Sequence, residues 1–219
     1  MKVLIAGGGV IGMLSALEFV DAGHEVVITD KAAMGREASW AGGGIVSPLY
    51  PWRYPPAVTA LATQAQGLYP ILAQRLRQAT GIDPELNPCG MLMLDADDHR
   101  DAIVWAGQYG RRLEILNQAA LARMGEGLGK FERGLWLPEV ANIRNPRLLQ
   151  ALRRALLLRG VEFREGEAGK AWRVAQGRVT GLQTGAGQVL EADHYVVAAG
   201  AWSAGLLAGI VHGIAVKPV

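Results

Sequence analysis

The start of the chain carries the apolar pattern of a strand, a turn, a helix and a second strand. Residues Lys2 to Ala6 are apolar after the first position and end at three glycines. Val10 to Ala22 then carry apolar residues at helical spacing until Gly23, and Glu25 to Thr29 form a β-branched run. A strand, helix and strand unit of about 30 residues joins parallel strands. The chain is therefore predicted to begin with a parallel α/β unit.

Further along the chain, loops alternate with helices and short strands. Helices are predicted from Val58 to Leu76, with a bend or restart at Pro70, and from Asp97 to Leu116. Asn145 caps a third helix that ends at Gly160, and residues 117–142 are less regular. Short strands follow from the remaining apolar runs, at Met91–Leu94, Val161–Phe163 and Tyr195–Ala198. Lys170–Val174 and Arg178–Thr184 are predicted as a hairpin-like pair of strands.

Composition and charge indicate an ordered globular protein. Half of the 219 residues are apolar and 19% are charged, which is enough for a substantial core. The 22 Lys and Arg residues against 20 Asp and Glu leave a net charge of +2, so there is no electrostatic reason to expect a nucleic-acid partner. Cys89 is the only cysteine, which excludes an internal disulfide and fits a reducing, cytoplasmic location. No metal site is expected, because no ligand spacing relates the four histidines, His24, His99, His194 and His212.

One segment near the N-terminus imitates a signal peptide. Val3 to Val20 is strongly apolar, but it contains four glycines and Glu18 and lacks a clean cleavage pattern. A buried strand and helix explain it better. No other window approaches the roughly 18 to 20 apolar residues of a membrane span, so none is expected.

The turn after the first strand fits a dinucleotide-binding fingerprint. Gly7 to Gly12 reads G-G-G-V-I-G, which matches G-x-G-x-x-G directly after a strand and at the start of a helix. In this motif the first glycine permits the tight turn, the second lets the backbone approach the phosphates, and the third lets helix and strand pack closely. The free N–H groups of the helix start suit a pyrophosphate. The candidate contacts are Gly7, Gly9, Val10, Ile11 and Gly12.

A carboxylate stands where such motifs read the ribose. Asp30 ends the second strand, eighteen residues beyond Gly12, and there it can accept both hydroxyls of an adenosine ribose. An acid at this position disfavours the 2′-phosphate of NADP. The alternative is an ordinary surface Asp in a turn. At this point both FAD and NAD remain open.

The sequence of the long loop after Asp30 resembles a known family, and this resemblance favours FAD over NAD. Residues 35–49, GREASWAGGGIVSPL, resemble the flavin loop of the D-amino acid oxidase superfamily. The continuation YPWRY at residues 50–54 is most similar to glycine oxidases of thiamine biosynthesis, the ThiO type, and VVAAGAWS at residues 196–203 resembles the strand and turn beneath the FAD. The resemblance implies FAD as the cofactor, with further contacts at Lys31, Arg36, Ala38, Ser39, Ala41, Gly42, Gly43, Ala171 and Gly200.

The same resemblance implies the architecture. Residues 1–47 and 142–219 would form an α/β, Rossmann-like FAD/NAD(P)-binding domain with a parallel sheet, and residues 48–141 part of an α+β substrate domain. Family members are longer, and they place the substrate-carboxylate arginine and the last glycine-rich FAD segment beyond Val219. We therefore expect an N-terminal portion of such an enzyme, with parts of both domains missing. Gly43 departs from relatives that carry a methionine beside the flavin.

The implied activity is oxidation of glycine, or a similar small amino acid, by O₂ to the imine and hydrogen peroxide, for thiazole assembly. No catalytic residue is assigned, because the normal carboxylate arginine lies outside the span; Arg36 and Arg53 are the nearest substitutes, and Arg111 falls on a predicted solvated helix face. This span alone is therefore expected to lack activity. The alternatives are a D-amino acid dehydrogenase, a sarcosine oxidase or an inactive FAD-binding module, and homo-oligomerisation is left open.

Overall fold

The structure is a computed structural model that describes residues 1–211 and divides into two compact units. The first unit contains Met1–Gly42, Leu76–Asp83 and the chain from Asn145 onward, and the second contains Gly43–Arg75 and Pro84–Arg144. That these units are an FAD-binding domain and a substrate domain stays a prediction.

A parallel sheet forms the centre of the first unit. Strands β1 (Lys2–Ala6), β2 (Glu25–Asp30), β6 (Glu162–Glu165) and β10 (His194–Val197) lie in the order β10-β1-β2-β6, and every neighbouring pair is parallel. Helix α1 (Val10–Asp21) connects β1 to β2. The predicted parallel α/β unit is confirmed, because the strand, helix and strand limits match the apolar pattern within one residue.

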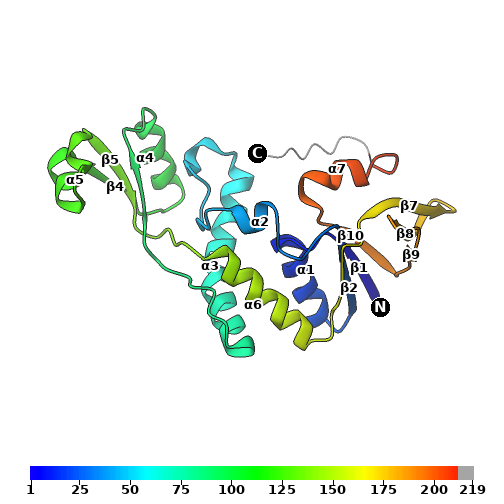
Figure 1. The fold of residues 1–219 in the computed structure, drawn as a ribbon. Coiled ribbons are helices and arrows are strands. Elements are labelled where there is room, and N and C mark those ends of the chain that lie inside the picture. Colours follow the sequence, from blue (N-terminus) through cyan, green and yellow to red (C-terminus); the bar gives the residue numbers. More distant parts are fainter. Residues whose placement is uncertain (212–219) are drawn as a thin grey trace. The chain divides into compact units, whose positions relative to one another are not determined.

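Helices cover one face of this sheet. Helix α1 lies beside α6 (Asn145–Leu158), which buries its apolar face, and the two can be followed along the parallel strands in Figure 1. Val3 and Ile5 of β1 are almost fully buried. Because side chains alternate along a strand, these two residues lie on the opposite face of β1 from Leu4 and Ala6, and they contribute to the helix side of the core.

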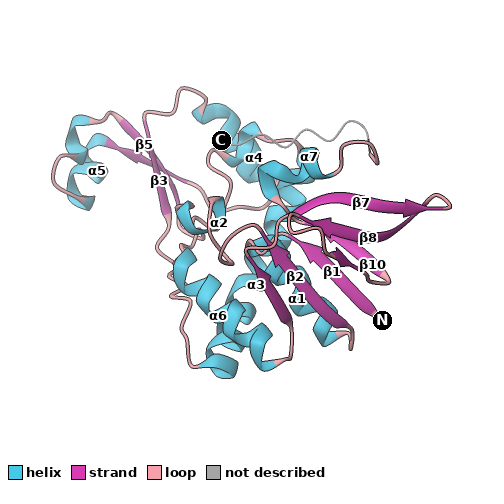
Figure 2. Ribbon diagram, turned by 45° about the vertical axis from the view of Figure 1, so that its right-hand side comes forward, coloured by secondary structure: helices cyan, strands magenta, loops and turns pink. Residues whose placement is uncertain are grey.

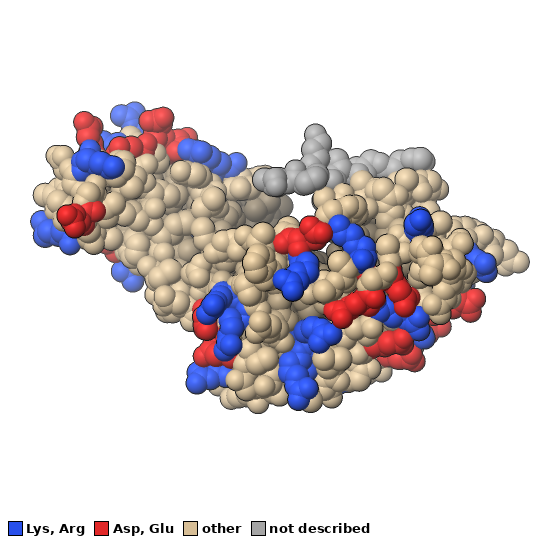
Figure 3. Space-filling view, viewed as in Figure 1, with Lys and Arg blue, Asp and Glu red and all other residues tan. Residues whose placement is uncertain are grey.

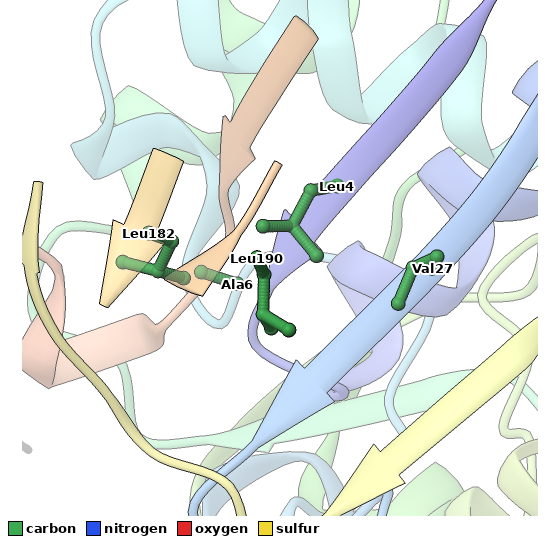
Figure 4. Close-up of a cluster of buried hydrophobic side chains, with 5 residues drawn as sticks. All are labelled: Leu4, Ala6, Val27, Leu182 and Leu190. Atoms are coloured by element: carbon green, nitrogen blue, oxygen red, sulfur yellow. The ribbon is translucent and has the colours of Figure 1, made fainter. Parts of the chain in front are cut away.

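An antiparallel sheet covers the other face. It consists of β7 (Gly169–Ala175), β8 (Arg178–Thr184) and β9 (Val189–Leu190), in the order β7-β8-β9. Figure 2 shows β7 and β8 as neighbouring strands. The predicted hairpin is therefore confirmed. The apolar contact between the two sheets is a cluster of five buried side chains (Figure 4): Leu4, Ala6, Val27, Leu182 and Leu190.

Two irregular segments complete the described part of the first unit. The long loop predicted after β2 contains, within the first unit, only the short helix α2 (Ala38–Ala41). After β10 the chain forms the 3-10 turn η3 (Gly200–Trp202) and helix α7 (Ser203–Leu206). Both segments follow carboxyl ends of parallel strands, which is the edge where ligands bind in open α/β sheets.

The second unit is built on a small antiparallel sheet. Its strands are β3 (Met91–Leu94), β5 (Arg133–Leu137) and β4 (Glu114–Asn117), in the order β3-β5-β4. Met93, Leu135 and Leu137 of this sheet form a core with Ala102 and Val140. The other elements of this unit are η1 (Pro51–Arg53), α3 (Pro56–Thr80), α4 (His99–Gln108), α5 (Gln118–Met124) and η2 (Leu128–Lys130). The end of α3, from Leu76 onward, belongs to the first unit.

Two sequence predictions in this region are wrong. The helix predicted from Asp97 to Leu116 ends at Gln108, because Gly110 adopts a positive φ of 61° and Glu114–Asn117 pairs with β5 instead. The stretch 117–142, predicted as less regular, contains α5 and β5. Of the bend or restart predicted at Pro70, the restart is not seen, since α3 is one continuous helix.

Candidate cofactor site

The glycine turn is formed by backbone contacts that leave no room for side chains. Gly7 has a φ of 115°, and a Cβ there would lie 2.3 Å from the carbonyl oxygen of Ala198. A Cβ on Gly12 would lie 1.9 Å from the Gly7 oxygen. The Gly7 N–H donates to the Thr29 carbonyl at 2.8 Å. These contacts place the start of α1 directly at the end of β1.

The N-terminus of α1 presents backbone donors. Gly9 is its N-cap and supplies no side-chain cap, and the first intrahelical bond runs from Met13 N–H to the Gly9 oxygen at 2.9 Å. The N–H groups of the first turn therefore have no partner within the helix, and together with the helix dipole they suit an anion. One of them, Val10 N–H, donates to Ser39 Oγ at 2.9 Å, and Ile11 beside it is 65% exposed. The structure thus brings Ser39 of the predicted flavin loop to the predicted pyrophosphate position.

Asp30 lies against the same turn. Its Oδ2 accepts the Gly8 N–H at 2.7 Å, and its Oδ1 accepts the Ala32 N–H at 3.0 Å. Each carboxylate oxygen has more than one lone pair, so both can accept a further hydrogen bond from a ligand hydroxyl. Asp30 is therefore a structural part of the turn as well as the candidate ribose ligand.

A buried side chain and two long-range hydrogen bonds that the sequence did not predict support this turn. Met34 is buried, and its Sδ lies where a Cβ on Gly8 would stand, 1.9 Å away. The Met34 N–H donates to Glu165 Oε1 at 2.8 Å, and this hydrogen bond holds the pKa of the Glu165 carboxyl below its ordinary value. Thr29 Oγ1 donates to the Glu167 carbonyl. These partners lie more than a hundred positions apart in the sequence, and no local pattern marks them.

The small residues of the flavin loop divide into packed and open positions. A Cβ on Gly42 would lie 2.8 Å from Asn145 Nδ2, which donates to the Gly42 carbonyl at 2.9 Å. Gly44 has a φ of 72°, and its Cβ would lie 1.9 Å from the Ile143 oxygen. Gly43 has no atom within 4 Å of the corresponding position. The space beside Gly43 is thus open within the described residues.

The remaining candidates lie around the loop or beyond it. Ala38 and Ala41 lie in α2, none of whose residues is buried, and Arg36 lies 5.9 Å from the ring centroid of Trp40. Lys31 contacts Trp202, and Gly200 begins η3 with a φ of 54°.

Ala171 is exposed in β7, where it pairs with Gln183 of β8. The family resemblance assigns the backbone of Ala171 to the adenine of FAD, and this assignment stays a prediction.

Arg53 does not serve as a free arginine for a substrate carboxylate. Its Nε lies 2.6 Å and its Nη2 3.0 Å from the two carboxylate oxygens of Asp98, a bidentate pair, and its guanidinium lies 4.0 Å from the Tyr50 ring centroid. The hydrogen bond from Arg53 lowers the pKa of the Asp98 carboxyl to about 2. The proposal of Arg53 as a substitute carboxylate ligand is therefore not supported by its contacts.

The prediction for Arg111 is wrong. It follows α4 instead of lying on a helix, its side chain is only 20% exposed, and it donates to Thr63 Oγ1. It lines a small cavity in the second unit together with Ser47, Gln66 and Trp105. The volume of about 20 Å³ holds about one water molecule and is too small for an amino acid.

Charge, metal and membrane features add little to the site. Figure 3 shows basic and acidic side chains interspersed over the face it presents. Among residues 1–211, no group of three or more His, Cys, Asp or Glu side chains is arranged to hold a metal ion, and His212 lies outside that range. Within the same residues, none of the helices has both the length and the apolar character needed to cross a membrane.

Comparison with known proteins gives the family. The DAO model, described as FAD dependent oxidoreductase, matches residues 2–219. The chain is 46% identical to the glycine oxidase of Pseudomonas putida over 100% of its own length and 60% of that protein. It is 31% identical to the bifunctional protein ThiO/ThiG of Nostoc sp., over 94% of this chain and 32% of the relative.

Comparison of the structure with solved structures agrees with the sequence comparison. The crystal structure of glycine oxidase from Geobacillus kaustophilus superposes with a TM-score of 0.85 at 28% identity, covering 94% of this chain and 58% of that one. The chain thus spans about 60% of the length of the first curated relative. The predicted Rossmann-like fold, the family resemblance and the choice of FAD over NAD are confirmed. The chain belongs to the DAO family of FAD dependent oxidoreductases.

Proposed function

We propose that this chain is the cofactor-binding part of a glycine oxidase. The observation that carries the proposal is the meeting of three elements at one sheet edge: the open donors of α1, the Asp30 carboxylate and Ser39 of the flavin loop. The identity of 46% to a glycine oxidase over the whole chain supports the substrate class. The ThiO name of another relative supports a role in thiazole assembly for thiamine.

The residues present fit FAD. The N–H of Ile11 would bind the pyrophosphate, because it belongs to the exposed start of α1. The Ser39 hydroxyl, which accepts the Val10 N–H, would donate its own proton to a phosphate oxygen. Asp30 would accept the ribose hydroxyls. The open backbone at Gly43 would lie against the isoalloxazine edge, and Ala171 against the adenine. The remaining contacts would come from Arg36, Ala38, Ala41, Gly42 and Gly200, whereas the Lys31 ammonium is paired with Glu37 and Trp202.

The reaction proposed for the enzyme is the oxidation of glycine, or a similar small amino acid, to its imine. The substrate loses two electrons and two protons, and O₂ takes them up as hydrogen peroxide. FAD supplies the hydride-accepting chemistry when bound, and the protein supplies binding and orientation. The residues described here act on the cofactor side of that reaction.

Flavin binding is the first test. We expect the purified chain to bind FAD with a defined stoichiometry, measured by its absorbance bands and by titration of flavin fluorescence. Gly9→Val should abolish this binding, because a Cβ on Gly9 already lies 2.9 Å from Ser39 Oγ and a larger side chain would displace the hydroxyl from Val10. Gly205→Ala is the matched control, since no atom lies within 4 Å of its Cβ position. Full flavin retention by Gly9→Val would place the pyrophosphate elsewhere.

Substrate choice is tested separately. This span by itself is expected to release no hydrogen peroxide, so the substrate comparison is made with the full-length enzyme. Hydrogen peroxide release is measured with added FAD from glycine, sarcosine and D-alanine, and an artificial electron acceptor replaces O₂ in parallel. Preference for glycine with O₂ supports the proposal. Preference for D-alanine with the artificial acceptor would instead indicate a D-amino acid dehydrogenase.

A further inference from the structure

A single ammonium group joins three segments around the candidate cofactor site. Lys31 directly follows β2, and its Nζ lies 3.4 Å from the ring centroid of Trp202 in η3. The same Nζ lies 3.0 Å from Oε1 of Glu37, in the loop that leads into α2. A cation over an indole face and within reach of a carboxylate is attracted by both. We call Lys31, Glu37 and Trp202 the Lys31 cluster.

Glu37 has a backbone conformation that requires outside support. Its φ of 57° and ψ of −140° lie in a region that residues other than glycine rarely adopt. Such a conformation persists only where neighbouring groups fix it. In the described structure the Glu37 side chain forms an ion pair with Lys31.

The conformation of Glu37 determines where Ser39 lies. The Glu37 carbonyl accepts the N–H groups of Trp40 and Ala41, both at 3.1 Å, and so begins the single turn of α2. Ser39 lies within that turn, and its Oγ accepts the Val10 N–H at the start of α1. A rotation at Glu37 would therefore move the Ser39 hydroxyl away from the helix N-terminus.

We propose that Lys31 is a positioning residue for the cofactor. Its ammonium holds the flavin loop against η3 through Glu37 and Trp202, and thereby keeps Ser39 at the N-terminus of α1. Lys31 acts on the dinucleotide through these residues and does not itself pair with a phosphate, since its charge is already engaged on two sides. The inference rests on the proposed function, because it assigns the pyrophosphate to α1.

The two modes of action predict opposite effects for Glu37. If Lys31 acts through the cluster, Lys31→Met should weaken FAD binding about tenfold, equivalent to ~1.4 kcal/mol. Glu37→Gln should then also weaken binding, and the double variant should be no weaker than Lys31→Met alone. Lys31→Arg should restore affinity to within about twofold, because a guanidinium also stacks on indole and pairs with carboxylate. If Lys31 bound a phosphate directly, Glu37→Gln would release the lysine and tighten FAD binding.

The dissociation constants come from flavin fluorescence titration of the full chain. Lys130→Met is the matched control, because Lys130 lies 5.1 Å from the Phe131 ring centroid and belongs to the second unit. Urea unfolding checks that each variant keeps its stability. Unchanged affinity in Lys31→Met, or tighter binding in Glu37→Gln, overturns the inference.

A second readout needs no cofactor. Trypsin cleavage after the exposed Arg36, followed by mass spectrometry, reports how firmly the loop is held. Lys31→Met and Trp202→Leu should both be cleaved several times faster than the wild type, and Lys130→Met should not. If the wild type bound no FAD, the proposed function would fail while this readout still decided whether the Lys31 cluster holds the loop. Equal cleavage rates for the wild type, Lys31→Met and Trp202→Leu would overturn the inference that the Lys31 cluster holds the loop.

Discussion

The glycine turn of the first unit and the Arg53–Asp98 pair of the second unit join their segments by different physical means. In the first unit the contacts that form the glycine turn are made by backbone atoms, as where Gly7 meets the Ala198 carbonyl and Gly12 meets the Gly7 oxygen. In the second unit Arg53 and Asp98, which lie 45 positions apart, meet through their side chains. A backbone contact fixes geometry closely because it has no rotamers to adjust.

This difference determines where each unit tolerates change. A side chain added at a backbone contact must displace the main chain, whereas loss of one exposed side-chain pair leaves the surrounding packing intact. The candidate cofactor site lies at the carboxyl edge of the rigid sheet, which suits a ligand that must be held in a fixed orientation. We therefore expect large effects of substitution at the glycines of the first unit and small effects at the surface pairs of the second.

The largest effect is expected for Gly7→Ala. Its φ of 115° is strained for any residue with a Cβ, and that Cβ would lie 2.3 Å from the Ala198 carbonyl oxygen. Strain and overpacking together should lower the free energy of unfolding by roughly 2 to 6 kcal/mol. Urea unfolding followed by circular dichroism measures the loss.

The matched control for Gly7→Ala lies in the second unit. Gly67 is in the middle of α3 with no atom within 4 Å of its Cβ position, so Gly67→Ala should be neutral or stabilise the protein by up to about 1 kcal/mol. Equal effects of the two substitutions would remove the distinction between the units.

A smaller effect is expected at Asp30. Asp30→Ala removes the carboxylate that accepts the Gly8 N–H and is proposed to accept the ribose hydroxyls. FAD binding should weaken by about 1 to 3 kcal/mol, the range for hydrogen bonds to a charged partner. Flavin fluorescence titration gives the value, and Asp193→Ala, which removes an acceptor of the Lys2 N–H, is the control. If Asp30→Ala bound FAD as tightly as the wild type, the ribose would have to lie elsewhere.

How much of this could be predicted from the sequence also differs between the units. The β1, α1 and β2 elements were predictable because their apolar periodicity is local and glycines mark the turn. Strand β4 was not, because Glu114–Asn117 carries no clear strand signal and forms by pairing with β5, where Ile115 lies opposite Leu135. Tertiary pairing there overrides the local helical pattern.

In the candidate site, too, some residues were predictable from the sequence and others were not. Gly9 and Asp30 followed from the spacing of the motif, and Ser39 followed from the family resemblance. The contacts that support them did not, since Met34 meets Glu165, 131 positions away, only after the sheet has formed. The Lys31 cluster likewise depends on η3, which reaches Lys31 through the register of β10 beside β1.

The smallest expected effect concerns the Arg53–Asp98 pair and its dependence on pH. Hydrogen bonding from Arg53 lowers the pKa of Asp98 from 3.8 to about 2 in the folded protein. A carboxyl whose pKa is lower in the folded state stabilises it above the unfolded-state pKa, and this contribution is lost as the pH falls through the folded-state pKa. The stability advantage of the wild type over Asp98→Asn should therefore be constant above about pH 5 and shrink from pH 4 towards pH 2.

Because the side chains of Arg53 and Asp98 are 50% and 24% exposed, the melting temperatures of the wild type and Asp98→Asn should differ at neutral pH by only about 1 to 3 °C. Thermal unfolding at pH 7, 5, 4 and 3 tests this, with the exposed neighbour substitution Asp97→Asn as the control. A difference between wild type and Asp98→Asn that stayed the same down to pH 3 would mean that the pair does not stabilise the fold through the ionised carboxyl.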